Sequence, residues 1–141
     1  MKGPEARLWQ KIREKTKSLD LFWTRVETWA TPGIPDLHGV TTTCSFWLEL
    51  KVHRLKSLKY VELRPHQIAW QTQYSNYNGN VWNLVSHPAS HTINIFSGKR
   101  AMEIGQRTNK NELDPCFIER GKNVDWKKIF DYIITHSNRS A

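Results

Sequence analysis

The hydrophobic pattern is clearest in the segment 46–52, where strand-forming residues dominate. In a β-strand, side chains two residues apart lie on the same face. The apolar row, which we expect to face a core, consists of Phe46, Leu48, Leu50 and Val52. The opposite row carries Trp47, Glu49 and Lys51. A carboxylate and an ammonium group at the end of an otherwise apolar strand indicate a chemical role.

A second carboxylate, Asp36, follows the turn formed by Gly33, Ile34 and Pro35. Glycine adopts dihedral angles that are closed to other residues, and proline fixes its own φ. We therefore expect a short strand, 36–40, that is directed back toward the strand 46–52. On such a hairpin, Asp36 comes to lie beside Glu49 at one end of the sheet.

Two carboxylates at this separation require a positive charge between them. A divalent cation such as Mg²⁺ suits a site made of oxygen ligands, and the sequence does not distinguish Mg²⁺ from Mn²⁺. Lys51 lies two residues beyond Glu49 on the same strand face, where it can position or deprotonate a water molecule.

The remaining periodicity predicts alternating strands and helices. In chain order we expect a helix over Pro4–Leu19, a strand over Leu21–Thr28, a helix from Pro65 to Tyr77, strands over Val81–Val85 and Thr92–Phe96, a short helix over Gly98–Ile104, an irregular polar segment over Gly105–Lys122, a helix over Val124–Thr135 and a flexible tail over residues 137–141. Residues 1–141 are thus expected to form a single α/β domain. Its mixed sheet of about five strands combines an antiparallel meander with a right-handed crossover.

Two polar residues share the apolar stripes of the predicted helices. Glu5 faces inward with Leu8 and Trp9, and it either favours the helix N-terminus electrostatically or supplies a carboxylate to the metal site. Gln67 falls on an inward stripe with three aromatic residues, Trp70, Tyr74 and Tyr77. A buried amide needs partners. Gln67 is therefore expected either to cap its helix or to line the site.

The charge balance favours a polyanionic partner. The chain has 21 Lys and Arg against 13 Asp and Glu, a formal net charge of +8. Such an excess suits nucleic acid, although simple solubility is the alternative. The chain also has 7 Trp, which can stack on unpaired bases, although most are expected in the core. The candidate phosphate contacts are Arg54, Lys56, Lys59, Arg64, Lys99 and Arg100.

Cysteine usage and hydropathy predict the compartment. Cys44 and Cys116 are far apart and in no metal-binding pair, which is typical of a reducing environment. The N-terminal residues contain no apolar run typical of a signal peptide, and no segment is long and apolar enough to span a membrane. We therefore expect a cytoplasmic protein, in the host cytoplasm if the protein is viral.

These motifs together resemble the PD-(D/E)XK nuclease superfamily. Pro35-Asp36 and Glu49-Leu50-Lys51 match both halves of its signature. The order Gly33-Ile34-Pro35-Asp36, then Glu49-Leu50-Lys51, then Arg64-Pro65-His66-Gln67 followed by Trp70 resembles the branch that contains VRR-NUC proteins and Holliday-junction resolvases. The likeness covers roughly Pro4 to Val85 by order of elements, with identity confined to the motifs. It implies a restriction-endonuclease-like core.

The resemblance also implies an activity and its residues. It implies a metal-dependent DNA endonuclease in which Asp36, Glu49 and the Leu50 carbonyl bind Mg²⁺ or Mn²⁺, Lys51 orients the attacking water and Gln67 supports that geometry. Glu5 would help to bind a second ion. The branch suggests branched or junction DNA as substrate, a homodimer, no small-molecule cofactor and, from the compact size, a phage source.

Two other functions remain open from the sequence. The first is a different nuclease: a duplex-nicking or restriction-like enzyme, or an exonuclease. The second is a nucleic-acid-binding protein that keeps the fold without turnover. Proteins of the second kind usually lose a member of the catalytic triad, whereas Asp36, Glu49 and Lys51 are all present here.

Overall fold

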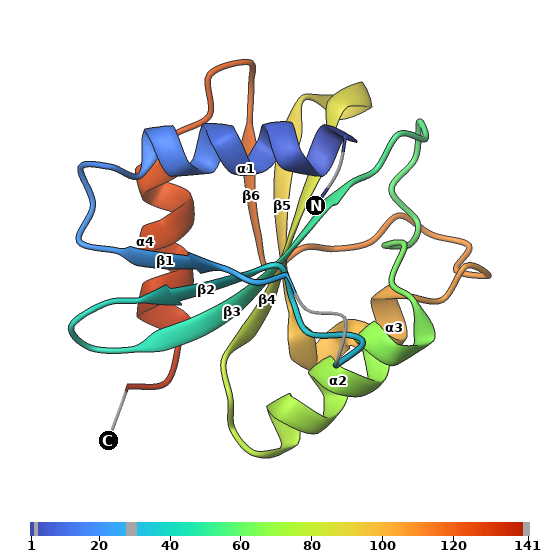
Figure 1. Cartoon of the computed structure of the whole chain (residues 1–141). Helices are drawn as coiled ribbons and strands as arrows, with labels where there is room; N and C mark the ends of the chain where they lie inside the picture. Colours follow the sequence, from blue (N-terminus) through green and yellow to red (C-terminus); the bar gives the residue numbers. More distant parts are fainter. Residues whose placement is uncertain (2, 28–30, 140–141) are drawn as a thin grey trace.

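The computed structural model describes residues 1, 3–27 and 31–139 (Figure 1). The elements in chain order are α1 (Gly3–Lys15), β1 (Phe22–Arg25), β2 (Leu37–Val40), β3 (Ser45–Val52), α2 (Pro65–Asn76), β4 (Val81–His87), η1 (Pro88–Ser90), β5 (Thr92–Ser97), η2 (Gly98–Arg100), α3 (Ala101–Ile104), β6 (Phe117–Arg120) and α4 (Trp126–His136). Among the described residues, no helix is both long and apolar enough to cross a membrane.

The strands form one mixed sheet in the order β1-β2-β3-β4-β5-β6. β1, β2 and β3 are an antiparallel meander, and β3 pairs in parallel with β4 after the crossover through α2. β5 and β6 continue the sheet with antiparallel pairing. The predicted α/β fold with a mixed sheet flanked by helices is confirmed. The sheet has one strand more than expected, because β6 lies in the segment predicted to be irregular.

Helices pack on both faces of the sheet, over hydrophobic clusters of different size. α1 and α4 pack on one face over the main hydrophobic cluster, which includes Ile12, Phe46, Leu48, Leu50, Leu84, Ile95, Ile129 and Phe130. The apolar row predicted for β3 is thus in the core. The other face carries α2, α3 and the loop after β3 over a smaller cluster that includes Leu58, Val61, Val85, Phe96 and Ile104. Glu49 and Lys51 project from β3 on this second face.

The ends of α2 follow from local chemistry. Pro65 occupies the first turn, where a missing N–H costs little, and the side chain of Gln67 accepts a hydrogen bond from the backbone N–H of Arg64 at 2.9 Å. The helix ends before Asn78, whose left-handed φ of 62° stops further helical hydrogen bonding. Tyr77 lies at this end and is 82% exposed, so the prediction that it faces inward is wrong.

The elements predicted near the two ends of the chain differ from the observed ones. The first helix ends at Lys15, and Thr16 donates its hydroxyl to the Ile12 carbonyl at 2.7 Å. The first strand covers only Phe22–Arg25, and Thr28 lies outside the described residues. In the predicted tail, Ser137 is buried and its hydroxyl accepts a hydrogen bond from the indole of Trp82. Residues 140 and 141 lie outside the described part of the chain.

Candidate active site

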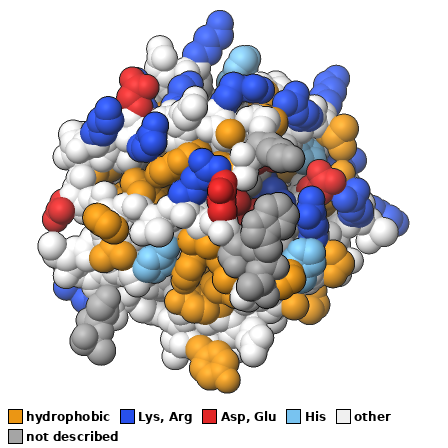
Figure 2. Space-filling model, viewed as in Figure 1, with side chains coloured by type: hydrophobic (Ala, Val, Ile, Leu, Met, Phe, Trp, Pro, Cys, Tyr) orange, Lys and Arg blue, Asp and Glu red, His pale blue; other side chains and the backbone are white. Residues whose placement is uncertain are grey.

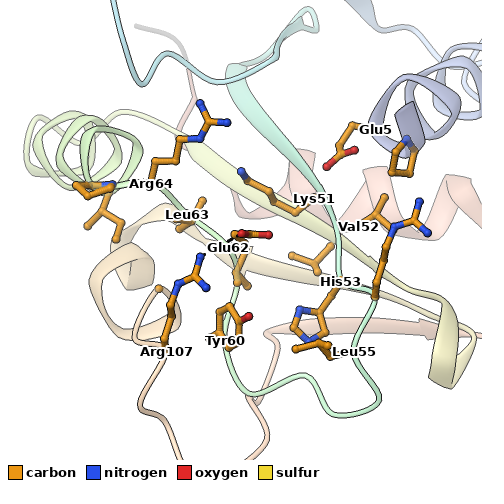
Figure 3. Close-up of a pocket in the computed structure, with 17 residues that line it drawn as sticks. Glu5, Lys51, Val52, His53, Leu55, Tyr60, Glu62, Leu63, Arg64 and Arg107 are labelled. Atoms are coloured by element: carbon orange, nitrogen blue, oxygen red, sulfur yellow. Dashed lines mark hydrogen bonds and ion pairs between the residues drawn. The ribbon is translucent and has the colours of Figure 1, made fainter. Parts of the chain in front are cut away.

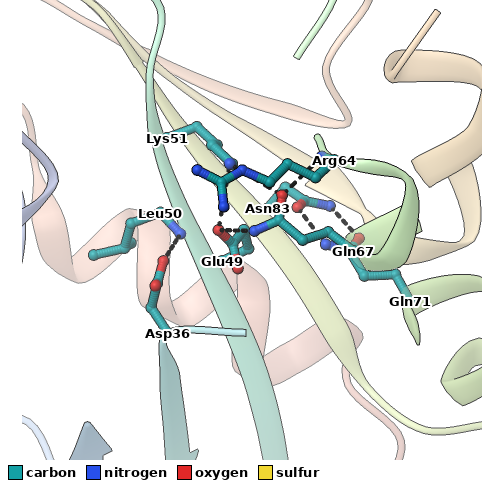
Figure 4. Close-up of polar contacts among 8 residues, drawn as sticks. All are labelled: Asp36, Glu49, Leu50, Lys51, Arg64, Gln67, Gln71 and Asn83. Carbon is teal, nitrogen blue, oxygen red and sulfur yellow. Dashed lines mark hydrogen bonds and ion pairs between the residues drawn. The ribbon is translucent and has the colours of Figure 1, made fainter. Parts of the chain in front are cut away.

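The carboxylates of Asp36 and Glu49 meet at the end of the β2–β3 hairpin. Leu37 pairs with Leu48, so Asp36 lies opposite Glu49 one position further along. The Asp36 Oδ2 atom accepts a hydrogen bond from the Leu50 backbone N–H at 2.9 Å (Figure 4). This bond replaces a ladder hydrogen bond beyond the end of β2 and holds the Asp36 side chain against β3.

Gly33 makes this turn possible. Its φ is +92°, a conformation that side chains with a Cβ rarely adopt. A Cβ at this position would lie 2.3 Å from the backbone oxygen of His66 in the first turn of α2. The turn before Asp36 is therefore packed directly against the start of α2. The same contact fixes the position of Asp36 relative to Gln67.

Glu49 is buried and incompletely paired. Its side chain comes from the middle of the sheet, and the residue is 3% exposed. Gln67 Nε2 donates to Glu49 Oε2 at 3.2 Å, and Lys51 Nζ lies 3.7 Å from the same oxygen. The other oxygen, Oε1, is buried and has no hydrogen-bond partner among the described residues. A buried oxygen without a partner is costly, and a bound cation would satisfy it.

Burial and mutual repulsion perturb both carboxyl groups. Burial raises the pKa of Asp36, and the Leu50 N–H partly opposes this increase. Burial also raises the pKa of Glu49 well above its usual range, and the adjacent Asp36 charge adds to that effect. Two close carboxylates resist simultaneous ionisation. A bound cation would relieve this conflict.

The donor set fits Mg²⁺ or Mn²⁺. Asp36 and Glu49 supply carboxylate oxygens, and hard divalent cations prefer oxygen ligands. The N–H and C=O of one strand residue point to the same side, so the Leu50 carbonyl faces the Asp36 side of β3. Within the described ranges, no third His, Cys, Asp or Glu joins these two carboxylates in a cluster. Glu5 therefore stands outside the immediate pair.

Lys51 and Gln67 form one hydrogen-bonded unit with Glu49. Lys51 Nζ donates to Gln67 Oε1 at 3.2 Å, and the Gln67 amide group donates to Glu49 (Figure 4). Gln67 Oε1 also accepts from the Arg64 backbone, so Gln67 both caps α2 and contacts the site. The two positions that the sequence left open for Gln67 are thus compatible, because the side chain caps α2 and also contacts Glu49 and Lys51. The helix cap fixes the amide that contacts Glu49 and Lys51.

A second amide pair, which sequence reasoning missed, attaches α2 to the sheet. Gln71 and Asn83 are fully buried, and their side chains exchange two hydrogen bonds of 2.8 and 2.7 Å. Asn83 pairs with Glu49 in the β3–β4 register, and Gln71 lies one helical turn after Gln67. The i, i+4 spacing of two glutamines was the available signal. The pair sets the height of Gln67 above the sheet.

A cleft of about 830 Å³ opens beside Lys51 (Figure 3). Glu5 of α1 and Arg64 enter it from opposite sides, with Lys51 between them. Arg54 and Arg107 also line it. The Arg107 guanidinium lies 5.2 Å from the centre of the Tyr60 ring and 3.1 Å from the Glu62 carboxylate. Sequence reasoning placed Arg107 in an irregular segment and missed this role in the cleft.

The other predicted phosphate contacts are distributed unevenly. Lys56 and Lys59 are exposed on the loop that borders the cleft, and Lys99 is exposed on η2. Arg100 instead donates to Glu103 at 2.6 Å and to the Asp114 carbonyl at 2.6 Å. Its charge is matched within its own surroundings, so we omit Arg100 from the proposed nucleic-acid surface.

Comparison with solved structures defines the class of fold. The structure of Hjc from Archaeoglobus fulgidus, a Holliday junction resolvase from an archaeal hyperthermophile, matches with a TM-score of 0.50 and 12% sequence identity, covering 76% of this chain and 84% of that chain. The chain thus shares the overall fold of this structure. No protein-family model matches the sequence. No curated protein matches it either.

The raised carboxyl pKa values predict how stability responds to pH and metal. A carboxyl group whose pKa rises on folding stabilises the fold below its unfolded pKa of about 4.3, and this contribution is lost as pH rises through the folded pKa. Without metal, we therefore expect Glu49→Gln to unfold at a higher temperature than the unsubstituted protein at pH 8, and the difference to shrink at pH 4. Thermal denaturation at both pH values measures it.

Bound metal should reverse this order of thermal stability, so that the unsubstituted protein becomes more stable than Glu49→Gln at pH 8. At about 100 times its dissociation constant, a ligand of the folded state adds about 2.7 kcal/mol to the free energy of unfolding. We expect Mn²⁺ or Mg²⁺ to produce such a gain at pH 8 in the unsubstituted protein and a much smaller one in Glu49→Gln. Equal gains in both proteins would place the metal elsewhere.

Proposed function

We propose that this chain is a metal-dependent DNA endonuclease that hydrolyses phosphodiester bonds. The observation that carries this proposal is that Glu49 is buried beside Asp36 with its Oε1 atom unpartnered among the described residues, while Lys51 Nζ lies 3.7 Å from its Oε2 atom. A merely structural carboxylate would be paired, because an unpaired buried oxygen destabilises the fold. The fold shared with a resolvase gives independent support.

Each residue has a distinct part in the proposed reaction. Asp36, Glu49 and the Leu50 carbonyl would hold a divalent ion, which supplies a Lewis acid and lowers the pKa of bound water. Lys51 would donate a hydrogen bond to the attacking water or to the phosphate oxygen that gains charge. Gln67 keeps the ammonium group in place through its 3.2 Å hydrogen bond. Glu5, from the side of α1, would help to place a second ion through bridging water.

The basic cleft is the proposed path of the DNA backbone. Arg54, Arg64 and Arg107 line it together with Lys51, and the chain as a whole has a net charge of +8. Phosphate contacts of this kind fix the position of DNA without reading its sequence. Lys56 and Lys59 would extend the contact along the loop, and Lys99 would meet a more distant phosphate.

The proposed substrate is branched DNA, such as a four-way junction, cut by a homodimer. This part rests on the likeness to a protein whose name states that it resolves Holliday junctions. Two symmetric cuts require two sites related by a two-fold axis, which a homodimer supplies. The alternatives are a duplex-nicking or restriction-like nuclease, an exonuclease, and a binding protein without turnover.

One assay separates these functions. A labelled four-way junction and a linear duplex of the same sequence are incubated with the protein in Mg²⁺, in EDTA and with Glu49→Gln. We expect paired, symmetric nicks in the junction that disappear in EDTA and in the variant. Equal cutting of both substrates would retain the nuclease and remove the junction preference. Binding without cutting in Mg²⁺ or Mn²⁺ would contradict the proposed activity.

A further inference from the structure

Four aromatic rings form a continuous series beside the carboxylate pair, and we name this series, His38, Trp47, Trp70 and Tyr74, the aromatic strip. The His38 and Trp47 rings lie 4.6 Å apart, those of Trp47 and Trp70 lie 5.6 Å apart, and those of Trp70 and Tyr74 are stacked at 4.7 Å. Two strands and one helix thus contribute to a single aromatic surface.

On each of the three elements, a residue of the strip lies two or three positions in sequence from a residue of the candidate active site. His38 lies on β2, two residues after Asp36, which directly precedes the strand, and Trp47 lies two residues before Glu49 on the same face of β3. Trp70 lies one helical turn after Gln67 on α2. A two-residue step along a strand spans roughly 7 Å. The strip is therefore parallel to the row of site residues and next to it.

The rings of the strip are not core residues. The structure describes every Trp of the chain except Trp29, and Trp9, Trp82 and Trp126 are each 7% exposed within the main hydrophobic cluster. Trp23 packs against the same cluster. Trp47 and Trp70 belong to neither of the two described clusters and are only half-buried, as are His38 and Tyr74.

The surrounding surface is also apolar and open. Phe22 is 71% exposed on β1, and Val40 is 37% exposed on β2. Through their pairing they lie on the same side of the sheet as His38 and Trp47. Figure 2 shows hydrophobic side chains gathered on this side of the molecule, between the strands and α2. An exposed aromatic surface that is continuous with a candidate active site indicates a ligand contact.

We infer that the aromatic strip binds unpaired nucleobases next to the phosphate that is cut. This inference rests on the proposed nuclease function and specifies its substrate: the strand that enters the site is locally single-stranded. A nucleotide carries an anionic backbone and a flat apolar base. The site lies between surfaces that match these two parts, with the basic cleft at Lys51 and Arg64 on one side and Trp47 and Trp70 on the other.

Nucleic acid fits this surface better than a second copy of the chain. The strip lies on β3 and α2, which also carry Glu49 and Gln67, and on β2, which begins directly after Asp36. A protein partner seated on the strip would therefore crowd the route of DNA into the site. Base stacking on aromatic side chains is tolerant of sequence, because every base has a flat face. Such a surface would recognise the opened bases of a branch point rather than a base sequence.

Fluorescence of 2-aminopurine tests the inference directly. One probe is a duplex with a short single-stranded gap that carries this base, and the other is the same strand fully paired. In the Glu49→Gln background, which prevents turnover, we expect binding to quench the gapped probe. Trp47→Leu and Trp70→Leu should each weaken binding to the gapped probe by about tenfold and leave binding to the paired probe nearly unchanged.

Matched variants separate stacking from folding. Trp47→Phe and Trp70→Phe keep a flat ring and should retain most of the quenching, whereas leucine keeps apolar volume without a ring. Tyr77→Ala removes an aromatic residue that is 82% exposed at the end of α2 but outside the strip, and it should change nothing. Thermal unfolding of each variant identifies any loss of binding that reflects a loss of fold. If the leucine variants prove unfolded, the quenching retained by the folded phenylalanine variants tests whether a flat ring is required.

Several results would overturn the inference. The inference would be contradicted if the leucine variants bound the gapped probe and the paired probe as tightly as their parent does. A change of oligomeric state in the leucine variants, seen by light scattering with probe binding unchanged, would instead make the strip an interface between copies. Metal-dependent cutting that is insensitive to Trp47→Leu and Trp70→Leu would keep the nuclease and remove the stacking surface. Gap-selective quenching without any cutting would remove the nuclease and keep the surface.

Discussion

Glu49→Gln is expected to lower the rate of DNA cleavage by about a thousandfold or more, the largest effect of any single change. Glu49 is 3% exposed, shares its site with Asp36 and has one oxygen without a partner among the described residues. Glutamine keeps the size of the side chain and a hydrogen bond to Gln67, but it removes the charge that would hold the cation. Single-turnover cleavage with Mg²⁺ measures the effect.

A carboxylate in the same cleft provides the control. Glu62 is exposed and pairs with Arg107 at 3.1 Å, away from Asp36. We expect Glu62→Gln to change the cleavage rate by less than about threefold, since exposed ion pairs contribute little. Similar losses in Glu49→Gln and Glu62→Gln would indicate a general effect of cleft charge on DNA binding and would remove the assigned role of Glu49.

Lys51→Met is expected to lower the cleavage rate by about a hundredfold to a thousandfold, the size of effect seen when one hydrogen-bond donor to a transition state is lost. Lys51 lies in the cleft with its Nζ held by Gln67 at 3.2 Å. Methionine preserves the apolar stem and removes the ammonium group. Because Lys51 is not a proposed metal ligand, the variant should still gain thermal stability from Mn²⁺. Rate and thermal denaturation together measure this difference.

A lysine on the opposite face of the sheet controls for net charge. Lys127 is exposed on α4, where it pairs with Asp131 at 2.6 Å. Lys127→Met lowers the net charge by the same amount and should leave the cleavage rate within about twofold of its value in the parent. Loss of the metal-dependent stability gain in Lys51→Met would contradict the division of roles between Lys51 and the carboxylates.

The sequence was most informative where structure is local. The two-residue period of β3 correctly separated the apolar row, including Leu48 and Leu50, from Glu49 and Lys51. A tight turn at Gly33 then restricted Asp36 to one end of the hairpin. These features depend on side-chain alternation and on backbone freedom, both of which can be read from neighbouring residues. The proposed chemical roles of these residues stay predictions.

The missed features depend on contacts between distant segments. β6 has four residues and is defined by its pairing with β5, which no local pattern specifies. Arg107 reaches the cleft only because its segment folds back over Tyr60. The aromatic strip is visible only after β2, β3 and α2 come together. Tertiary context of this kind overrides local propensity and is absent from periodicity.

The most direct test of the proposed activity is cleavage of a labelled four-way junction by the unsubstituted protein and by Glu49→Gln, purified side by side and assayed in Mg²⁺ and in EDTA. The arrangement of Asp36, Glu49 and Lys51 predicts nicks in Mg²⁺ alone and none with the variant. Cleavage that persists in EDTA, or that Glu49→Gln performs at the rate of the unsubstituted protein, would contradict metal-dependent hydrolysis at this site.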